Sequence, residues 1–591
     1  MNKQKWLLKG FLFVLITIVL VLLSNTYHRN TGTFNWKSEI WADKAGYYIY
    51  LPVTFLYRYD LSKAPEKIDE KTGYGFTIDN TGKKIQTKYT CGVSVMIFPF
   101  FAATHYYCKL KKVDELGGFA QPYNKMINLA AIFYFLLGLF FLKRLLAFYY
   151  PPWIQYTTLL VLFLTTNLFY YVLADTLMSH VYSFSLFAFF LYSLKRFLDN
   201  DKDVPWFIAV AFSTGLIFLV RPVNVLFFIL FFFWDVSGFQ DVWARIRLLF
   251  RPGNLLIFVL ITGLMIFPQL VYWNYTYGSW FHYSYGNEGF TNWSNPYIAE
   301  VLFAPLNGLF LYSPLMILVF AGMAWMILKR QKNGILVLLF FLALVYECAA
   351  WHCWYFGCSF GQRAFVEYLV LFSIPVSFIL QTFAASRFRA YLLSFIILVL
   401  VVFSFYTISL SMNYEKCFFG STWDWPHFGR QLYSSGIKLV SQPSSDFYND
   451  FENGSLREYQ PQTSTIVHSG LFSIAVVPEK EFCCQFIKPV RDFPGTMTRF
   501  VKAGIWIYKE IPDSLGAILV CTLDMPDGKS VSWHGCNIDA YVLGPGKWYH
   551  VEKEFLLPAD ITGDMKFGVY LWNRKKSTFF ADDMSVKFVR K

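Results

Sequence analysis

The chain has 591 residues, of which 55% are hydrophobic, 21% are aromatic and only 15% are charged. Soluble globular domains carry about 25% charged residues, so this composition excludes an ordinary soluble enzyme. The formal net charge of +13 could suit nucleic acid. However, the Lys and Arg residues cluster in short breaks between apolar runs, as in the cytoplasmic loops of membrane proteins. The sequence therefore predicts a polytopic membrane protein without a nucleic-acid partner.

The apolar runs of the first 410 residues have the length of membrane-crossing helices. Residues 6–23 have Lys3, Lys5 and Lys9 before or near their start and lack a small-residue cleavage site. We therefore interpret them as an anchor with a cytoplasmic N-terminus and not as a signal peptide. Further spans are predicted at 124–146, 153–173, 178–198, 255–273, 305–328, 334–353, 363–383 and 389–410.

Two apolar segments are predicted to depart from a single straight span. Residues 205–234 are too long for one span and are interrupted at Arg221-Pro222, which predicts two short helices that meet at the outer face. The run Cys91–Cys108 contains Pro99, and counting it as a span breaks the alternation of loop charges. We interpret it as a re-entrant or surface helix, which leaves about eleven crossings.

The loop charges predict which segments lie outside. Basic residues fall on the cytoplasmic side at 143–144, 195–196, 245–251, 329–332 and 387–389. The segments predicted to be extracytoplasmic are 24–123, 174–180, 274–304 and everything after about 411.

The C-terminal part has a different pattern. From Asp446 onward, short alternating runs stand between turn signals such as Asp527-Gly528. This pattern predicts one antiparallel β-sandwich over 446–591, joined by a linker at 411–445 to the membrane domain at 1–410. Because it follows the last span, the β-sandwich is expected to be extracytoplasmic.

The ten cysteines do not suggest a disulfide framework. Cys483 and Cys484 are adjacent, a spacing that rarely bridges. Pairing of Cys521 with Cys536 across neighbouring strands is one alternative. The absence of a CxxC pair with matching His or Cys spacing disfavours zinc.

The polar residues of the predicted exterior follow a recognisable order. Asp43 and Gly46-Tyr47-Tyr48 come after the first span, and the later motifs are Lys88-Tyr89-Thr90-Cys91-Gly92, Asp175, Gly215 through Arg221-Pro222, Gly308 through Ser313-Pro314, and Phe360-Gly361-Gln362-Arg363. Over roughly residues 1–410 this order resembles the polytopic GT-C glycosyltransferases. The resemblance is strongest to relatives of the protein O-mannosyltransferases (glycosyltransferase family 39) and the lipid A aminoarabinose transferases.

The resemblance implies transfer of a sugar from a polyprenyl-phosphate donor at the outer face. Such a reaction needs a base for the acceptor hydroxyl and positive charge for the leaving phosphate. Asp43 matches the first-loop acid of the family and is the candidate base, and Asp175 matches its second acid. The candidate donor- or acceptor-binding residues are Lys88, Tyr89, Arg221, Arg363, His180, His282 and Glu288.

Each of these residues has a structural alternative. Asp43 could cap a surface helix, and Asp175 could be a loop residue between helices. Arg221 and Arg363 could snorkel to the interface, and Lys88 could contact lipid headgroups. The histidines and Glu288 could be hydrogen-bonding interface residues.

The first loop also departs from the family pattern. Where the family commonly has Asp-Glu, this chain has Asp43-Lys44, so one carboxylate is missing from its usual place. Glu39, one helical turn earlier, could replace it. A divalent metal at the active site is therefore left open.

The tail resembles the jelly-roll domains of carbohydrate-binding modules. The residues that carry this resemblance are Asp450 through Gly454, His468-Ser469-Gly470, Trp548 and Ala581 through Met584. It implies a structural calcium held by Glu452 and Asp582, since oxygen-only ligands suit calcium; the alternative is that they cap strand ends. Trp506, Trp533 and Trp572 belong either to a sugar-binding face or to the core.

Together these features predict a membrane glycosyltransferase that moves a sugar from a polyprenyl-phosphate donor to a glycan, lipid or protein acceptor. The alternatives are a transporter or flippase of lipid-linked glycans and a non-catalytic glycan-binding assembly protein. The expected location is a bacterial inner membrane with the tail in the periplasm, and membrane lipid is an expected partner.

Overall fold

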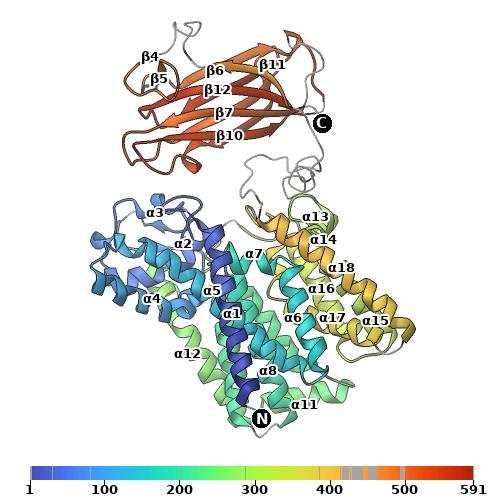
Figure 1. The fold of residues 1–591 in the computed structure, drawn as a ribbon. Coiled ribbons are helices and arrows are strands. Elements are labelled where there is room, and N and C mark those ends of the chain that lie inside the picture. The colour runs from blue at the N-terminus through green and yellow to red at the C-terminus, as the bar shows by residue number, and fades with distance from the viewer. Residues whose placement is uncertain are drawn as a thin grey trace. The chain divides into compact units, whose positions relative to one another are not determined.

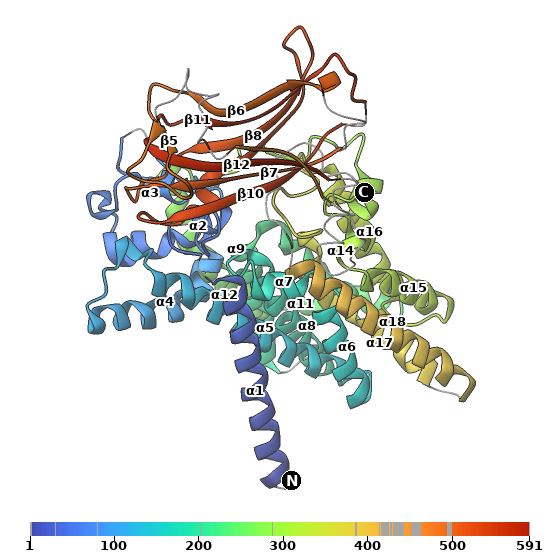
Figure 2. The same cartoon turned by 45° about the horizontal axis from the view of Figure 1, so that its top comes forward.

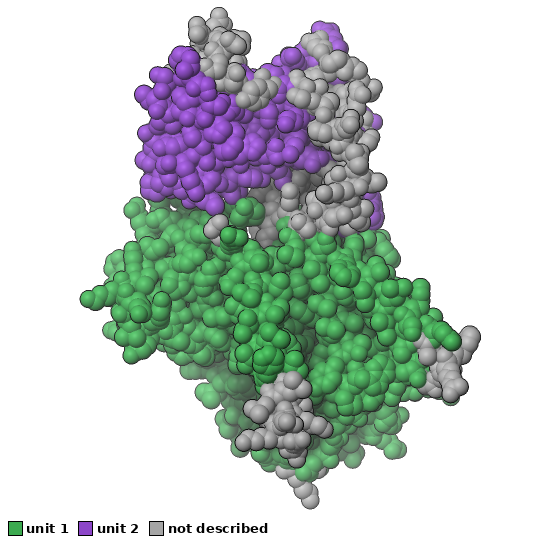
Figure 3. All heavy atoms as spheres, viewed as in Figure 1, with its two compact units in different colours: residues 1–416 green, residues 417–591 purple. Residues whose placement is uncertain are grey.

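The computed structural model describes residues 3–589 except 30, 80, 201–202, 287, 385–386, 413, 415–424, 426–427, 429–442, 450, 452–461, 493–498 and 559. The chain divides into two compact units, Met1–Lys416 and Cys417–Lys591 (Figure 3). The first unit is helical and the second is built of antiparallel strands (Figure 1). The predicted fold class, a helical membrane protein followed by an all-β domain, is confirmed.

Eleven apolar helical segments make up the described membrane part. Five are long and apolar enough to cross a bilayer, namely α1 (Lys3–Tyr27), α5 (Gln121–Leu146), α8 (Ser179–Asp199), α12 (Pro252–Tyr277) and α18 (Arg387–Met412). Six are shorter, namely α6 (Pro152–Leu164), α9 (Val204–Val220), the continuous η4 (Pro222–Ile229) and α10 (Leu230–Phe233), α15 (Leu315–Leu328), α16 (Gly334–Ala350) and α17 (Leu369–Ala384). Their positions follow the predicted spans closely.

The predicted break in residues 205–234 lies where the proline places it. Helix α9 ends at Val220, Arg221 is extended with φ −158° and ψ 106°, and η4 begins at Pro222. Proline lacks the N–H that would continue the ladder, and it disfavours helical geometry in the residue before it. The break leaves Arg221 at the junction of the two helices.

Two further breaks were not predicted. The expected span 153–173 divides into α6 and α7 (Leu168–Leu173), and the expected span 305–328 divides into α14 (Leu309–Tyr312) and α15. The two breaks face each other, because the Asn167 N–H donates to Ser313 Oγ at 3.0 Å. Hydroxyls next to the first break bond back into their own helix, which competes with the regular ladder.

Helix α4 (Gly92–Lys111) corresponds to the segment predicted to lie on the surface. It contains Pro99 and is not among the helices with the apolar character of a span. It lies across the direction of α1 in both views (Figure 1, Figure 2). Its first residue, Gly92, meets the end of α9 so closely that a Cβ there would lie 2.2 Å from the Leu219 carbonyl carbon.

Short elements connect the apolar helices. Those between α1 and α5 are α2 (Asp43–Tyr48), η1 (Pro52–Tyr57), η2 (Leu61–Lys63), α3 (Ile68–Lys71), the hairpin β1 (Thr77–Ile78) and β2 (Ile85–Gln86), and η3 (Leu116–Gly118). Those later in the chain are α11 (Phe239–Leu249), α13 (Ile298–Phe303) and η5 (Arg363–Phe365). The segments before α2 and η5 carry the candidate site.

The second unit is a sandwich of two antiparallel sheets. One has the order β10-β7-β12-β5-β4 with β3 also paired to β12, and the other has the order β6-β11-β8-β9. The strands are β3 (Pro443–Asn449), β4 (Gln462–Thr463), β5 (Ser473–Val476), β6 (Phe482–Pro489), β7 (Phe500–Tyr508), β8 (Ala517–Asp524), β9 (Ser530–Asn537), β10 (Trp548–Leu556), β11 (Lys566–Asn573) and β12 (Phe579–Val589). The 3-10 turns η6 (Val490–Asp492) and η7 (Ile538–Ala540) connect some of them.

Alternation along the strands fills the space between the sheets. In β7, Val501, Ala503, Ile505 and Ile507 are fully buried. The side chains between them, including Trp506, are partly exposed on the outer face. This period of two is what a sheet with one buried face requires.

The structure excludes one disulfide considered from the sequence and contains another that was not predicted. Cys521 and Cys536 do not form a disulfide with each other, because Cys536 is opposite Leu519 in the β8–β9 register and Cys521 is opposite His534. Cys358, in the loop before η5, is disulfide-bonded. The adjacent Cys483 and Cys484 are buried and form no disulfide.

Candidate functional site

Asp43 is the first residue of α2, at a point where the backbone is closely confined. Ala42 before it has φ 50° and ψ −131°, a conformation that is rare for a residue with a Cβ. Gly75 lies against the same peptide, since a Cβ on it would lie 1.8 Å from the Ala42 oxygen. Ala42 is the N-cap of α2 and no side chain caps the helix, so Asp43 does not have the capping role considered as its alternative.

The Asp43 carboxylate contacts a cation and a phenol. Arg363 Nη2 lies 3.3 Å from Asp43 Oδ2, although 320 residues separate them in the chain. Burial and the nearby charge of Asp43 raise the pKa of Tyr89. Tyr89 therefore keeps its hydroxyl proton at neutral pH. Thus Asp43, Tyr89 and Arg363, three of the candidate residues, lie close together.

Tyrosine rings line this carboxylate. Tyr47 and Tyr89 have ring centroids 4.2 Å apart, and Tyr285 lies 6.3 Å from Tyr89. The Lys88 ammonium lies over Tyr89 and Tyr285, at 5.6 Å and 5.7 Å from their centroids. Gly46 makes the arrangement possible, because a Cβ there would lie 2.4 Å from the Tyr89 ring. Aromatic rings beside an acid are suited to a sugar ring or an isoprenoid chain.

The ion pairs of this region are of two kinds, open and closed. In the open pairs the side chains are partly exposed: Lys88 and Glu288 are 32% and 37% exposed, and Arg363 and Asp43 are 18% and 38% exposed. An incoming phosphate or hydroxyl can reach these groups and compete for them.

In the closed pairs the carboxylate is buried, although the Arg221 side chain is itself 18% exposed. Arg221 Nη1 lies 2.9 Å from Glu367 Oε1, and the Glu367 side chain is completely buried. Lys44 Nζ lies 3.2 Å from Asp175 Oδ1, and both side chains are less than a tenth exposed. A buried carboxylate held in this way positions the cation and the element that carries it.

Glu367 is the centre of the larger closed network. It accepts hydrogen bonds from His180 Nδ1 at 2.8 Å, from Arg221 Nη1 at 2.9 Å and from Asn224 Nδ2 at 3.2 Å. The imidazole of His180 is buried against Tyr171. The structure therefore places His180 inside the protein behind Arg221 and not beside Asp43.

Asp175 lies beneath the helix that carries Asp43. Its partner Lys44 is the residue directly after Asp43, and Lys44 also donates to the Ser38 carbonyl at 3.1 Å. Lys44 thus joins the segment before α2 to the turn before α8. The role of Asp175 as a second catalytic acid stays a prediction, and its geometry favours positioning of α2.

Glu39 does not face the Asp43 carboxylate as its replacement. It is buried and is held by Asn128 Nδ2 at 2.9 Å and by Lys125 and His28 at 3.3 Å each. Burial opposes ionisation, but His28 and Lys125 hold the pKa of the Glu39 carboxyl below its ordinary value of 4.5. Glu39 therefore joins the start of the first loop to α5.

The loop 278–297 closes the site on the side of Lys88. Ser284 donates to the Lys88 carbonyl at 2.8 Å, and Lys88 Nζ lies 2.7 Å and 2.9 Å from the two Glu288 oxygens. His282 stacks on Tyr277 at 3.7 Å between centroids and is placed at the edge of this loop. The two loops predicted to be extracytoplasmic are thus bonded to each other.

Two residues of the site, Glu367 and Tyr285, were missed from the sequence. Glu367 is an ionisable group at the entrance of an apolar helix, which is itself a functional indication. Their partners are 100 to 200 residues distant in the chain, as in the pair of Arg221 with Glu367.

The described residues do not fit a divalent metal at this position. They include no group of three His, Cys, Asp or Glu side chains that could hold an ion. Arg363 occupies one oxygen of Asp43, and the other candidate carboxylates, Asp175 and Glu288, are bonded to Lys44 and Lys88. The cations of the site supply the positive charge locally.

The second unit carries the residues of the tail prediction. Asp582 accepts from the His468 and Ser469 N–H groups at 2.9 Å and 3.2 Å, whereas Glu452 lies outside the described residues. Burial raises the pKa of Asp582. The structural calcium at Glu452 and Asp582 stays a prediction.

The tryptophans of the tail do not belong to its core. Trp533 is 45% exposed, and Trp572 and Trp506 are partly exposed. Trp572 stacks on Phe482 at 6.2 Å and lies 6.4 Å from Trp533, on the outer face of the sheet β6-β11-β8-β9. Trp506 stacks on His468 at 3.8 Å on the other sheet. Each sheet thus presents an aromatic surface.

Comparison with known proteins gives matches only among solved structures. No protein-family model and no curated protein matches the sequence. The archaeal oligosaccharyltransferase AglB from Archaeoglobus fulgidus, solved with an inhibitory peptide and a dolichol-phosphate, aligns with 68% of this chain and 56% of its own, at 10% identity and a TM-score of 0.37. The arabinosyltransferase EmbB from Mycobacterium smegmatis aligns with 98% of this chain and 64% of its own, at 9% identity and a TM-score of 0.34.

The second unit has its own matches. The C-terminal family 22 carbohydrate binding module of Clostridium thermocellum Xyn10B aligns with 24% of this chain and 93% of its own, at 16% identity and a TM-score of 0.19. These solved structures are what the chain is similar to, at 16% identity or less.

Proposed function

We propose that this protein is a membrane glycosyltransferase that moves a sugar from a polyprenyl-phosphate donor to an acceptor hydroxyl. The observation that carries the proposal is the open pair of Asp43 with Arg363, bordered by Tyr89 and Lys88. It brings a carboxylate within reach of a hydroxyl proton and two cations within reach of a phosphate. Those are the charges that glycosyl transfer from a phosphate requires.

The proposed step conserves atoms and charge. The acceptor oxygen attacks the anomeric carbon of the donor sugar while its proton passes to Asp43. The bond between the anomeric carbon and the phosphate oxygen breaks, and the polyprenyl phosphate leaves with the electron pair. Arg363 and Lys88 stabilise the charge that develops on that phosphate, with the bidentate geometry of Arg the better match.

The donor phosphate is proposed to free the base. In the structure Arg363 is bonded to Asp43 and Lys88 is bonded to Glu288, so all four groups are paired. A phosphate that binds Arg363 and Lys88 replaces both carboxylates, which leaves Asp43 available to the acceptor. Arg221 lies behind them, fixed by Glu367, and adds positive potential without leaving its partner.

The tail domain is proposed to hold a glycan near the membrane surface. Exposed aromatic side chains on a sheet can stack on sugar rings, and here Trp572 stacks on Phe482 and meets Trp533 edge to face. The proposed location is a bacterial inner membrane with the site and the tail on the periplasmic side.

The reaction class is tested by label transfer from a panel of radiolabelled polyprenyl-phosphate sugars in membranes. Wild-type protein is compared with Asp43→Asn and with Asp60→Asn, a matched change at an exposed acid of the same loop that bonds only Ser62 and Lys63. We expect transfer by wild type and Asp60→Asn and none by Asp43→Asn. Transfer that is equal in all three would contradict the role of Asp43.

A further inference from the structure

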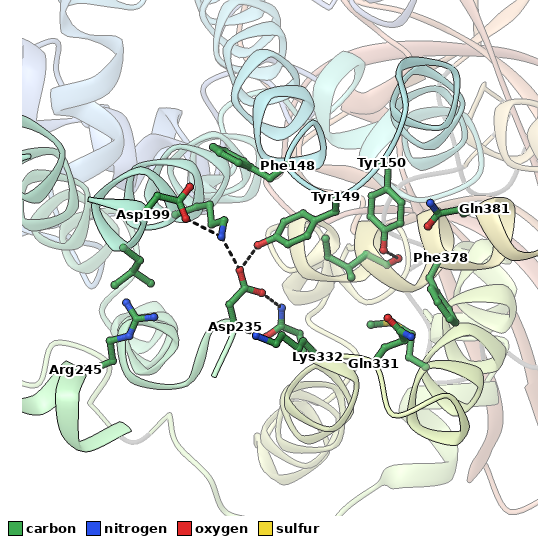
Figure 4. Close-up of a pocket in the computed structure, with 15 residues that line it drawn as sticks. Phe148, Tyr149, Tyr150, Asp199, Asp235, Arg245, Gln331, Lys332, Phe378 and Gln381 are labelled. Atoms are coloured by element: carbon green, nitrogen blue, oxygen red, sulfur yellow. Dashed lines mark hydrogen bonds and ion pairs between the residues drawn. The ribbon is translucent and has the colours of Figure 1, made fainter. Parts of the chain in front are cut away.

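A cavity at the opposite end of the helices has no part in the proposed reaction. Its volume is about 540 Å³, within the range of small-molecule sites. It is formed by the turns and ends of α5, α8, α10, α11, α15, α16 and α17 (Figure 4). Its lining includes the aromatic rings of Phe148, Tyr149 and Phe378 and the amides of Gln331, Gln381 and Asn333. Charged groups also contribute to the lining.

The length of helix α8 gives the distance between the cavity and the candidate site. Its first residue, Ser179, accepts a hydrogen bond from Tyr47 in the site, and Lys195 near its other end lines the cavity. Sixteen residues at 1.5 Å per residue place the two ends about 24 Å apart, close to the thickness of a bilayer core. The cavity is therefore at the other membrane face, which the loop charges predict to be cytoplasmic.

The floor of the cavity is a fixed network around Asp235. Lys195 Nζ lies 2.9 Å from Asp199 and 3.2 Å from Asp235, and Asn333 Nδ2 donates to Asp235 at 2.7 Å (Figure 4). Tyr149 also donates to Asp235. Both carboxylates of the lining are thus already satisfied by protein donors.

Two basic side chains of the lining are not part of this network. Arg245 and Lys332 form no ion pair with any carboxylate in the part of the chain that the structure describes, and Figure 4 shows both at the cavity wall. Arg245 is on α11, whose exposed residues include Phe239 and Trp243. Exposed aromatic side chains beside a basic residue suit the headgroup region of a membrane.

We propose that this cavity binds the phosphate of an anionic lipid headgroup, held by Arg245 and Lys332. Basic pockets between helices at the cytoplasmic face are suited to anionic headgroups because the phosphate gains charge-assisted hydrogen bonds that it lacks in a micelle or in the bulk lipid. The amides Gln331 and Gln381 can bond the remaining polar groups of the headgroup. Free phosphate has the same chemistry, and the test separates the two sources.

The test uses the full-length protein in an uncharged detergent, where no leaflet potential contributes. Binding of short-chain phosphatidylglycerol is measured by native mass spectrometry for wild type, Arg245→Gln and Lys332→Gln. The matched control is Arg247→Gln, because Arg247 is exposed on the same helix and does not line the cavity. Phosphatidylcholine and inorganic phosphate are the comparison ligands, and thermal stability confirms that each variant is folded.

We expect phosphatidylglycerol to bind wild type and Arg247→Gln equally, and the affinity to fall about tenfold in Arg245→Gln or Lys332→Gln. Inorganic phosphate that binds with the same dependence on the two variants would support the phosphate chemistry with a soluble anion as its source. Equal binding of phosphatidylcholine, an equal loss in Arg247→Gln, or no loss in the two cavity variants would overturn the proposal. None of these outcomes depends on transferase activity.

Discussion

Removal of the charge of Glu367 should destabilise the helical unit far more than removal of an open acid. Glu367→Gln keeps the shape of the side chain but leaves the Arg221 guanidinium, at 2.9 Å, with no carboxylate in a region where Glu367 is completely buried. Breaking a buried ion pair on one side costs about 3–5 kcal/mol. Adding Arg221→Gln should recover part of the loss, because no charge is then left buried alone.

Glu288→Gln is the matched control for this prediction. It makes the same chemical change at a carboxylate that is 37% exposed and paired with Lys88 at 2.7 Å. Water and salt screen an exposed pair, so its loss should cost about 1 kcal/mol or less.

The assay is the fraction of protein that stays monodisperse in detergent after heating, measured over a range of temperatures for the three variants and wild type. The expected order of stability is wild type, then Glu288→Gln, then the double variant, and last Glu367→Gln. If Glu367→Gln were no less stable than Glu288→Gln, the division into open and closed pairs would be refuted.

Three further predictions concern the surroundings of the site. Gly46→Ala should displace the Tyr89 ring, which lies 2.4 Å from the added Cβ, and cost about 1–3 kcal/mol in thermal stability together with transfer activity; unchanged stability would contradict the close approach. Asp175→Asn should lower stability by about 3 kcal/mol because Lys44 is left buried without its carboxylate, and its remaining folded fraction should retain transfer, unlike that of a catalytic acid. The pKa of Glu39 in the folded state is below 4.5, so its contribution to the free energy of unfolding is present above pH 4.5 and is lost as the pH falls through the lowered pKa. Glu39→Gln should therefore flatten the decline in stability between about pH 5 and pH 3. A profile identical to that of wild type would contradict this role of Glu39.

The helices that end at a proline were predictable from sequence, and those that end through tertiary contacts were not. Arg221-Pro222 marks its own break, because the missing N–H acts locally. The break at Ser313-Pro314 carries the same local signal as Arg221-Pro222. The break beside Asn167 lies inside an apolar run without a proline, and a hydrogen bond joins it to Ser313, 146 residues away. No local pattern contains that information.

In the candidate site, too, residues with a local signal were predictable and pairings between distant residues were not. The sequence identified Asp43, Tyr89 and Arg363, because polar groups at a membrane boundary are conspicuous in an apolar chain. It did not show that the Arg221 charge is held by Glu367 or that Asp175 is matched to Lys44. Which cations are open to a phosphate is decided by these pairings, so it required the fold.

The most direct test of the central claim is the turnover number of Asp43→Asn at saturating donor, normalised to folded protein. A general base contributes about 10²- to 10⁴-fold to the rate, so turnover should fall by that factor while donor affinity, which depends on Arg363 and Lys88, is retained. A turnover number within about twofold of wild type would contradict the account and remove Asp43 from the reaction.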